Sequence, residues 1–111
     1  MGNRMTSVSF PVFHGYEVRV ILAKDVAATG RRLRNDLSNA CGGLVTKDAH
    51  PMRCWLVLET KAEPSTVAHE AYHAVKEMFR AMGTGDDEEM FAYHLGHLVG
   101  RIHKFMKRNK R

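Results

Sequence analysis

The chain has 111 residues, which is about the size of one domain and excludes a two-domain enzyme. An apolar fraction of 44% and a charged fraction of 26% are ordinary for a globular chain and exclude wholesale disorder. No apolar run approaches the roughly 18 residues of a membrane span, and residues 1–13 lack a signal-peptide core, so we expect a soluble, cytoplasmic protein without membrane contact.

The net charge of +5 is concentrated at the C-terminus. Residues 104–111 carry five of the 17 basic side chains, so the rest of the chain is neutral overall. Such tails are usually solvated, and nucleic acid bound through this one would be held weakly and without sequence preference, so we do not expect a nucleic-acid partner. We assign 1–111 to a single domain with an N-terminal arm at 1–15 and a basic tail at 104–111.

The first half of the chain alternates between strand and helix patterns. Residues 16–23 alternate and then become continuously apolar, as in a strand that is increasingly buried. Residues 24–37 are amphipathic and predict a helix with Asp25 as its N-cap. Residues 44–47 predict a short strand, and residues 53–60 predict a longer one.

The second half of the chain has helical spacing. A helix is predicted from Ser65, its N-cap, to Met82, and Thr84 with Asp87 has the spacing of a capping box for the next helix. That last helix has one apolar stripe: Phe91, Leu95, Leu98, Ile102 and Phe105. The order predicts an α+β fold with a small mixed sheet of about three strands, one N-terminal helix and two C-terminal helices.

Residues 69–73 read His-Glu-Ala-Tyr-His, an HExxH motif inside the predicted helix. Residues four apart lie one turn apart on a helix face, so the imidazoles of His69 and His73 can reach one tetrahedral zinc. Glu70 points about 100° away, from where it can take a proton from a zinc-bound water and deliver it to a leaving amine. The alternative is a pair of surface histidines without a metal, since both lie opposite the apolar stripe.

A zinc hydrolase needs a third protein ligand, and the last helix opens with acidic residues 86–89. Acids in a first turn also complement the helix dipole, which explains Asp86 and Asp87 without a metal. The face of Glu89 continues through three residues: Tyr93, Gly96 and Gly100. Two glycines on this face would let another helix approach closely, so Glu89 is the predicted third ligand, with Glu88 as its substitute.

The HExxH motif, a short loop and a second helix with Glu-x-x-Ala resemble the gluzincin branch of zinc metallopeptidases, over roughly residues 16–103. The pattern Glu-x-x-Ala-Tyr-x-x-Gly at 89–96 is similar to small HExxH proteins encoded by tailed bacteriophages, which would place the protein in the cytoplasm of a bacterial host. The resemblance implies a minimal zincin scaffold with one Zn²⁺ per chain on His69, His73 and Glu89, and Glu70 as general base. It also implies an extended peptide substrate along residues 54–59, as the edge strand.

Two further residues of the last helix are candidates for catalysis. Gluzincins often have an aspartate four residues after the ligand glutamate, and this chain has Tyr93 there, as a weaker orienting group or an oxyanion donor. His97 lies about 80° from Glu89 and could reach the rim of the cleft as a transition-state donor. Otherwise His94 and His97 are expected on a solvated polar face.

These patterns predict a zinc-dependent peptidase-like protein acting on a peptide or protein substrate that the sequence does not specify. One alternative is an inactive zincin-fold module that binds a protein partner, with zinc structural or absent, since a small chain has little room for specificity pockets. The other is a nucleic-acid-associated protein that uses the basic tail. Cys41 and Cys54 have neither metal-ligand nor disulfide-framework spacing and are predicted to be reduced in the core.

Overall fold

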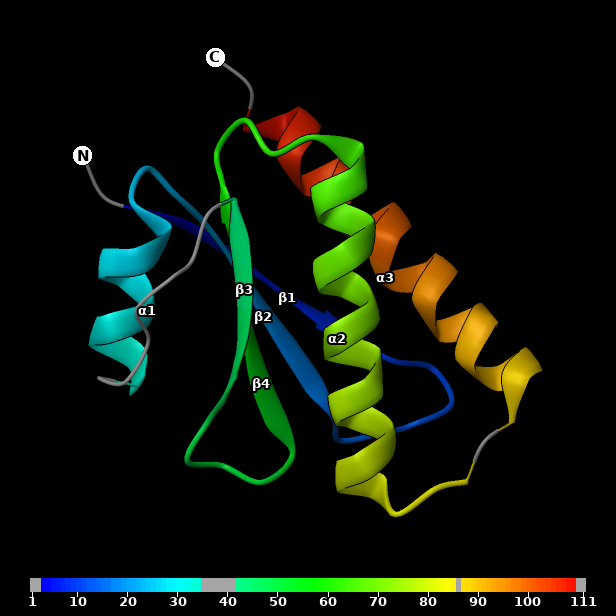
Figure 1. Ribbon diagram of the computed structural model, residues 1–111. Coiled ribbons are helices and arrows are strands. Elements are labelled where there is room, and N and C mark those ends of the chain that lie inside the picture. Colours follow the sequence, from blue (N-terminus) through cyan, green and yellow to red (C-terminus); the bar gives the residue numbers. More distant parts are fainter. Residues whose placement is uncertain (1–2, 35–41, 86, 110–111) are drawn as a thin grey trace.

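The computed structural model describes residues 3–34, 42–85 and 87–109 and has the predicted α+β class (Figure 1). Its elements in chain order are β1 (Arg4–Ser9), β2 (Glu17–Ala23), α1 (Val26–Arg34), β3 (Gly43–Lys47), β4 (Arg53–Glu59), α2 (Pro64–Met82) and α3 (Glu88–Arg108). In the described part of the chain, no helix combines the length and apolar character needed to cross a bilayer.

The four strands form one mixed sheet in the order β1-β2-β4-β3. β2 and β4 are parallel, with Glu17 opposite Arg53, whereas β1 and β3 pair antiparallel to their neighbours. β4 is therefore an interior strand, and the expectation that residues 54–59 form the edge strand is wrong. β3 is the outer strand on this side of the sheet.

The strand β1 lies where the sequence predicts only an N-terminal arm. Its Val8 is fully buried, and Phe10, just after the strand, is 2% exposed. β1 pairs along its whole length with β2, from Arg4 opposite Leu22 to Ser9 opposite Glu17. The sheet consequently has four strands rather than about three, because a polar strand with one well-buried apolar residue gives little sequence signal.

Helices cover both faces of the sheet, α1 on one and α2 with α3 on the other (Figure 1). The larger apolar core lies between the sheet and the α2–α3 pair, and it includes Leu56, Met78 and Ile102. A smaller cluster lies beneath α1 and includes Ile21 and Leu44. Cys54 is a free, fully buried thiol, as predicted, whereas Cys41 lies outside the described residues.

The helix starts agree only in part with the predicted caps. Asp25 caps α1 as expected, because its Oδ1 accepts a hydrogen bond from the Ala28 N–H at 2.9 Å. α2 begins at Pro64 with Glu63 as its N-cap, two residues before the predicted N-cap Ser65. α3 is capped by Asp87, whose Oδ1 accepts from the Met90 N–H at 3.0 Å, so the predicted capping box at 84–87 is wrong.

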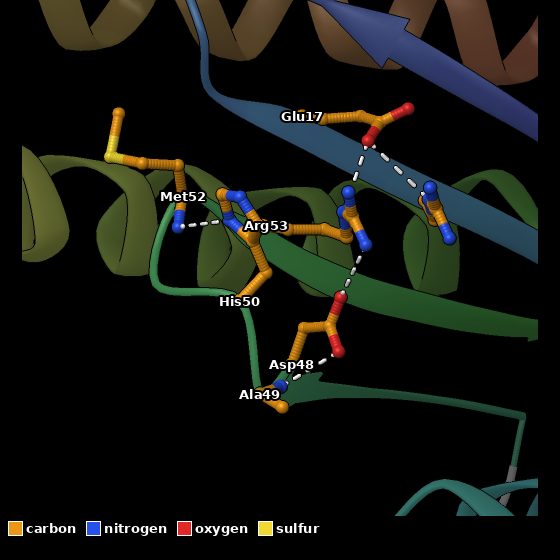
Figure 2. Close-up of polar contacts among 7 residues, drawn as sticks. Glu17, Asp48, Ala49, His50, Met52 and Arg53 are labelled. Carbon is orange, nitrogen blue, oxygen red and sulfur yellow. Dashed lines mark hydrogen bonds and ion pairs between the residues drawn. The ribbon is translucent and has the colours of Figure 1, made fainter.

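Arg53 joins the β3–β4 turn to β2 (Figure 2). Its Nε donates to Glu17 Oε1 and its Nη1 donates to Asp48 Oδ2, each at 3.1 Å. In the same turn the Met52 N–H donates to His50 Nδ1 at 3.1 Å. These contacts fix the turn at one end of β3, the strand that borders the candidate site.

Candidate metal centre

The two histidines of the HExxH motif lie together on the solvent side of α2. The opposite side of the helix packs on the sheet through a continuous buried stripe: Val67, Ala71, Ala74, Val75, Met78 and Phe79. His69 and His73 are exposed, and their Nε2 atoms lie 3.3 Å apart. The helix thus presents the pair to solvent while its own position is fixed by apolar packing.

The distance between these nitrogens fits a shared metal ion. Two nitrogens bound at about 2.0–2.1 Å to a tetrahedral zinc are about 3.3 Å apart. The Nε2 atoms of His69 and His73 have this separation. The pair could supply two of the three protein donors that a catalytic zinc needs. The same distance also allows one neutral imidazole to donate a hydrogen bond to the other without a metal.

Glu70 lies between the histidine pair and the sheet. It is only 8% exposed, in keeping with its place beside the apolar stripe of α2. A Cβ added to Gly43 of β3 would lie 2.7 Å from Glu70 Cγ, so the carboxylate stem packs directly on the outer strand. Burial raises the pKa of the Glu70 carboxyl, and nearby His69 and His73 oppose that shift.

A cleft of about 1280 Å³ borders His73, whereas His69 does not line it. Its walls come from the outer strand β3 at Val45–Lys47, from the exposed side of α2, which includes His73, and from α3. α3 contributes Glu88, Phe91, Ala92 and Leu95, which are one stripe of that helix. An extended chain lying in this cleft would therefore run beside an outer strand and past His73.

The structure does not bring Glu89 to the histidine pair. Glu89 is exposed and does not line the cleft, whereas its predicted substitute, Glu88, does. A Cβ added to Gly96 or Gly100, the glycines expected to allow a close helix, would meet no neighbouring atom within 4 Å, so this face of α3 is open. Within residues 3–34, 42–85 and 87–109, no three His, Cys, Asp or Glu side chains are grouped closely enough to hold a metal ion.

Tyr93 and His97 do not line the cleft either. Tyr93 is 54% exposed and lies edge-on to His94. His97 Nε2 lies 3.1 Å from the Ser9 carbonyl oxygen, from which we infer that it donates a hydrogen bond to the end of β1. The geometry gives His97 a structural role between α3 and the sheet.

His94 is fully buried, so the expectation of a solvated face at this position is wrong. Its ring lies among Phe10, Phe13 and Phe79, with ring centroids 4.8–6.3 Å apart. In the described part of the chain neither ring nitrogen has a hydrogen-bond partner. Burial lowers the pKa of the imidazole, and His97 adds to this shift.

Gly43 is a residue of the site that the sequence patterns do not identify. Its signal is the Gly42-Gly43 pair at the start of a strand, which by itself indicates only a break in the chain. A glycine inside a strand often marks a close approach by another group, and here that group is Glu70.

No model of a known protein family matches the chain, and no curated protein sequence and no solved structure is significantly similar to it. The assignment of a function therefore depends on the geometry of the residues themselves.

Proposed function

We propose that this protein is a zinc-dependent peptidase in which His69 and His73 hold the metal and Glu70 is the general base. The observation that carries the proposal is the 3.3 Å separation of the two Nε2 atoms on one exposed helix face, which suits a tetrahedral metal. A hydrogen bond between metal-free imidazoles would account for the same separation, and the buried glutamate beside the pair is what favours the metal.

Glu70 has the surroundings of a general base. When bound, zinc would lower the pKa of a water ligand and polarise the carbonyl group of a substrate. Glu70 would accept the proton of the attacking water and return it to the leaving nitrogen. Burial raises the pKa of Glu70, which makes its carboxylate a stronger base than that of an exposed glutamate.

The third metal ligand is proposed to come from the acidic first turn of α3. The family resemblance favours Glu89, whereas the lining of the cleft favours Glu88, which borders the same space as His73. The two residues can be separated experimentally because they lie about 100° apart on the helix and only one of them would be needed.

The substrate is proposed to be an extended peptide that pairs with β3. The outer edge of this strand has no neighbouring strand in the described sheet, so its backbone groups can bind an added strand. Val45, Thr46 and Lys47 line the cleft beside His73, which would set the scissile bond near the metal-binding pair. This assignment replaces β4, which lies inside the sheet.

The test is native mass spectrometry on protein purified without chelator, comparing the wild type with His73→Ala, Glu88→Ala and Glu89→Ala. We expect one zinc per chain in the wild type, loss of zinc in His73→Ala, and loss in one of the two glutamate variants. His14→Ala, which removes an exposed histidine from a loop, is the matched control and should retain zinc. A wild-type protein that takes up no zinc even after addition contradicts the proposal.

Hydrolysis is tested separately with Glu70→Gln, which keeps the size of the side chain and removes the base. We expect this variant to bind zinc and to lose cleavage of an unstructured protein substrate such as casein.

A second candidate is a partner-binding module without catalysis, and the missing third donor among the described residues favours it. If the wild type binds zinc but neither the wild type nor Glu70→Gln cleaves the substrate, this candidate is supported instead.

A further inference from the structure

A second hollow, of about 1100 Å³, shares no lining residue with the cleft beside His73. It lies at the carboxyl ends of the two parallel strands, β2 and β4, where Leu22 and Thr60 line it. Segments distant in sequence meet here at one end of the sheet: the start of β1, the turn into α1, the connection into α2 and the C-terminal part of α3 (Figure 1). The carboxyl ends of parallel strands are a frequent place for ligands in sheets that are flanked by helices.

The lining of the hollow is strongly basic. Five cations from separate segments contribute to it: Arg4, Lys24, Arg32, Lys61 and Lys107. Asp25 is the one carboxylate among the residues that line the hollow, and it accepts a hydrogen bond from the Ala28 N–H at the start of α1. The ion pairs that the described residues form involve only Glu17, Asp48 and Glu77 with arginines outside the hollow, so these five cations are not neutralised by them.

Part of this basic lining is held in place before any ligand binds. Thr29 is only 4% exposed, and its Oγ1 accepts hydrogen bonds from Arg32 Nη2 at 3.4 Å and from Asn3 Nδ2 at 3.3 Å.

The remaining lining is apolar and includes Leu22, Ala28, Ala62 and Met106. A hollow with apolar walls and a cluster of cations suits a compact ligand with a flat apolar body and several phosphates. Nucleic acid would instead need an extended basic surface along its backbone. We propose that this hollow binds a nucleoside di- or triphosphate, with the base on the apolar walls and the phosphates on the arginine and lysine side chains.

The proposal is tested by titrating the full chain with a fluorescent ATP analogue at physiological salt and displacing it with unlabelled ligands. Arg32→Gln and Lys61→Gln each remove one lining cation and should weaken binding by about tenfold. Arg31→Gln is the matched control, because Arg31 is an exposed neighbour on α1 that does not line the hollow. It should leave the affinity unchanged.

The competing ligands decide what the hollow recognises. We expect ATP and ADP to displace the probe far better than adenosine, which lacks the phosphates, or pyrophosphate, which lacks the base. No binding of the probe overturns the proposal, as does equal weakening by Arg31→Gln, which would indicate diffuse charge attraction. Pyrophosphate as effective as ATP, or a short single-stranded oligonucleotide more effective than ATP, would also overturn it. None of these measurements depends on zinc or on peptidase activity.

Discussion

Gly43 of β3 and Glu70 of α2 are in direct contact, at a distance that leaves no room for a side chain on residue 43. A Cβ at this position would lie 2.7 Å from Glu70 Cγ, 3.1 Å from Leu58 Cδ2 and 3.2 Å from the Val57 carbonyl oxygen. Because two of these neighbours are held by the sheet, the carboxylate would have to move. The outer strand and the proposed general base are thereby linked.

We expect Gly43→Ala to destabilise the protein by about 1–3 kcal/mol through overpacking, and to displace Glu70. Urea unfolding measures the first effect, and the rate of substrate cleavage measures the second. If Glu70 is the base, the rate in the folded variant should fall with little loss of zinc, since the histidine ligands are not touched. An unchanged stability would show that the strand and helix separate at no cost.

In contrast to Gly43, the two glycines of α3 should tolerate alanine and gain stability from it. Gly96 and Gly100 lie within α3, are exposed and have open space around a Cβ position. Alanine restricts the unfolded chain and favours helix, so each substitution to alanine should stabilise the protein by about 0.5–1 kcal/mol. Thermal unfolding of the single and double variants tests this. A loss of stability would mean that a partner chain or helix covers this face, as the spacing of the glycines suggests.

The sequence predicts the elements that have strong periodicity and misses what depends on their packing. β2, β4 and α2 are recognisable because long apolar patterns leave one choice of secondary structure. The order of the strands is not local information, and for this reason the apolar pattern of β4 does not reveal that β3 lies outside it.

The candidate site shows the same division. The position of His69 beside His73 follows from helix spacing alone, and the structure brings their Nε2 atoms to 3.3 Å. Whether Glu88 or Glu89 turns toward that pair depends on how α3 packs against α2. His94 illustrates this point, because it is buried in α3 although helix spacing led us to expect it on the polar face with His97.

Cys54 should be almost unreactive in the native protein. The side chain is fully buried, and burial raises its pKa to about 12, so the nucleophilic thiolate is scarce at neutral pH. In a Cys41→Ser variant, where Cys54 is the remaining thiol, we expect slow reaction with a disulfide reagent and a steep increase with urea. The rate should follow the fraction of unfolded chain. Rapid modification in native buffer would show that β4 is accessible to reagents.

The burial of His94 should make the protein sensitive to acid. Its pKa is lowered in the folded state, so below the ordinary histidine pKa of about 6.5 the unfolded chain binds a proton that the folded chain does not. Stability from this group is therefore fully present above about pH 6.5 and decreases as the pH falls toward the lowered pKa. His97 on the same helix adds to the shift rather than opposing it.

Urea unfolding across this pH range, for wild type and His94→Met, measures the effect. Methionine fills a similar apolar space without a proton to bind, so the variant should lose most of the decline in stability on acidification. His103→Met replaces an exposed histidine on the same helix and should keep the wild-type decline. A His94→Met protein with the same pH dependence as the wild type would show that other groups cause the acid sensitivity. It would also imply that the cage of Phe10, Phe13 and Phe79 opens readily enough for the imidazole to be hydrated.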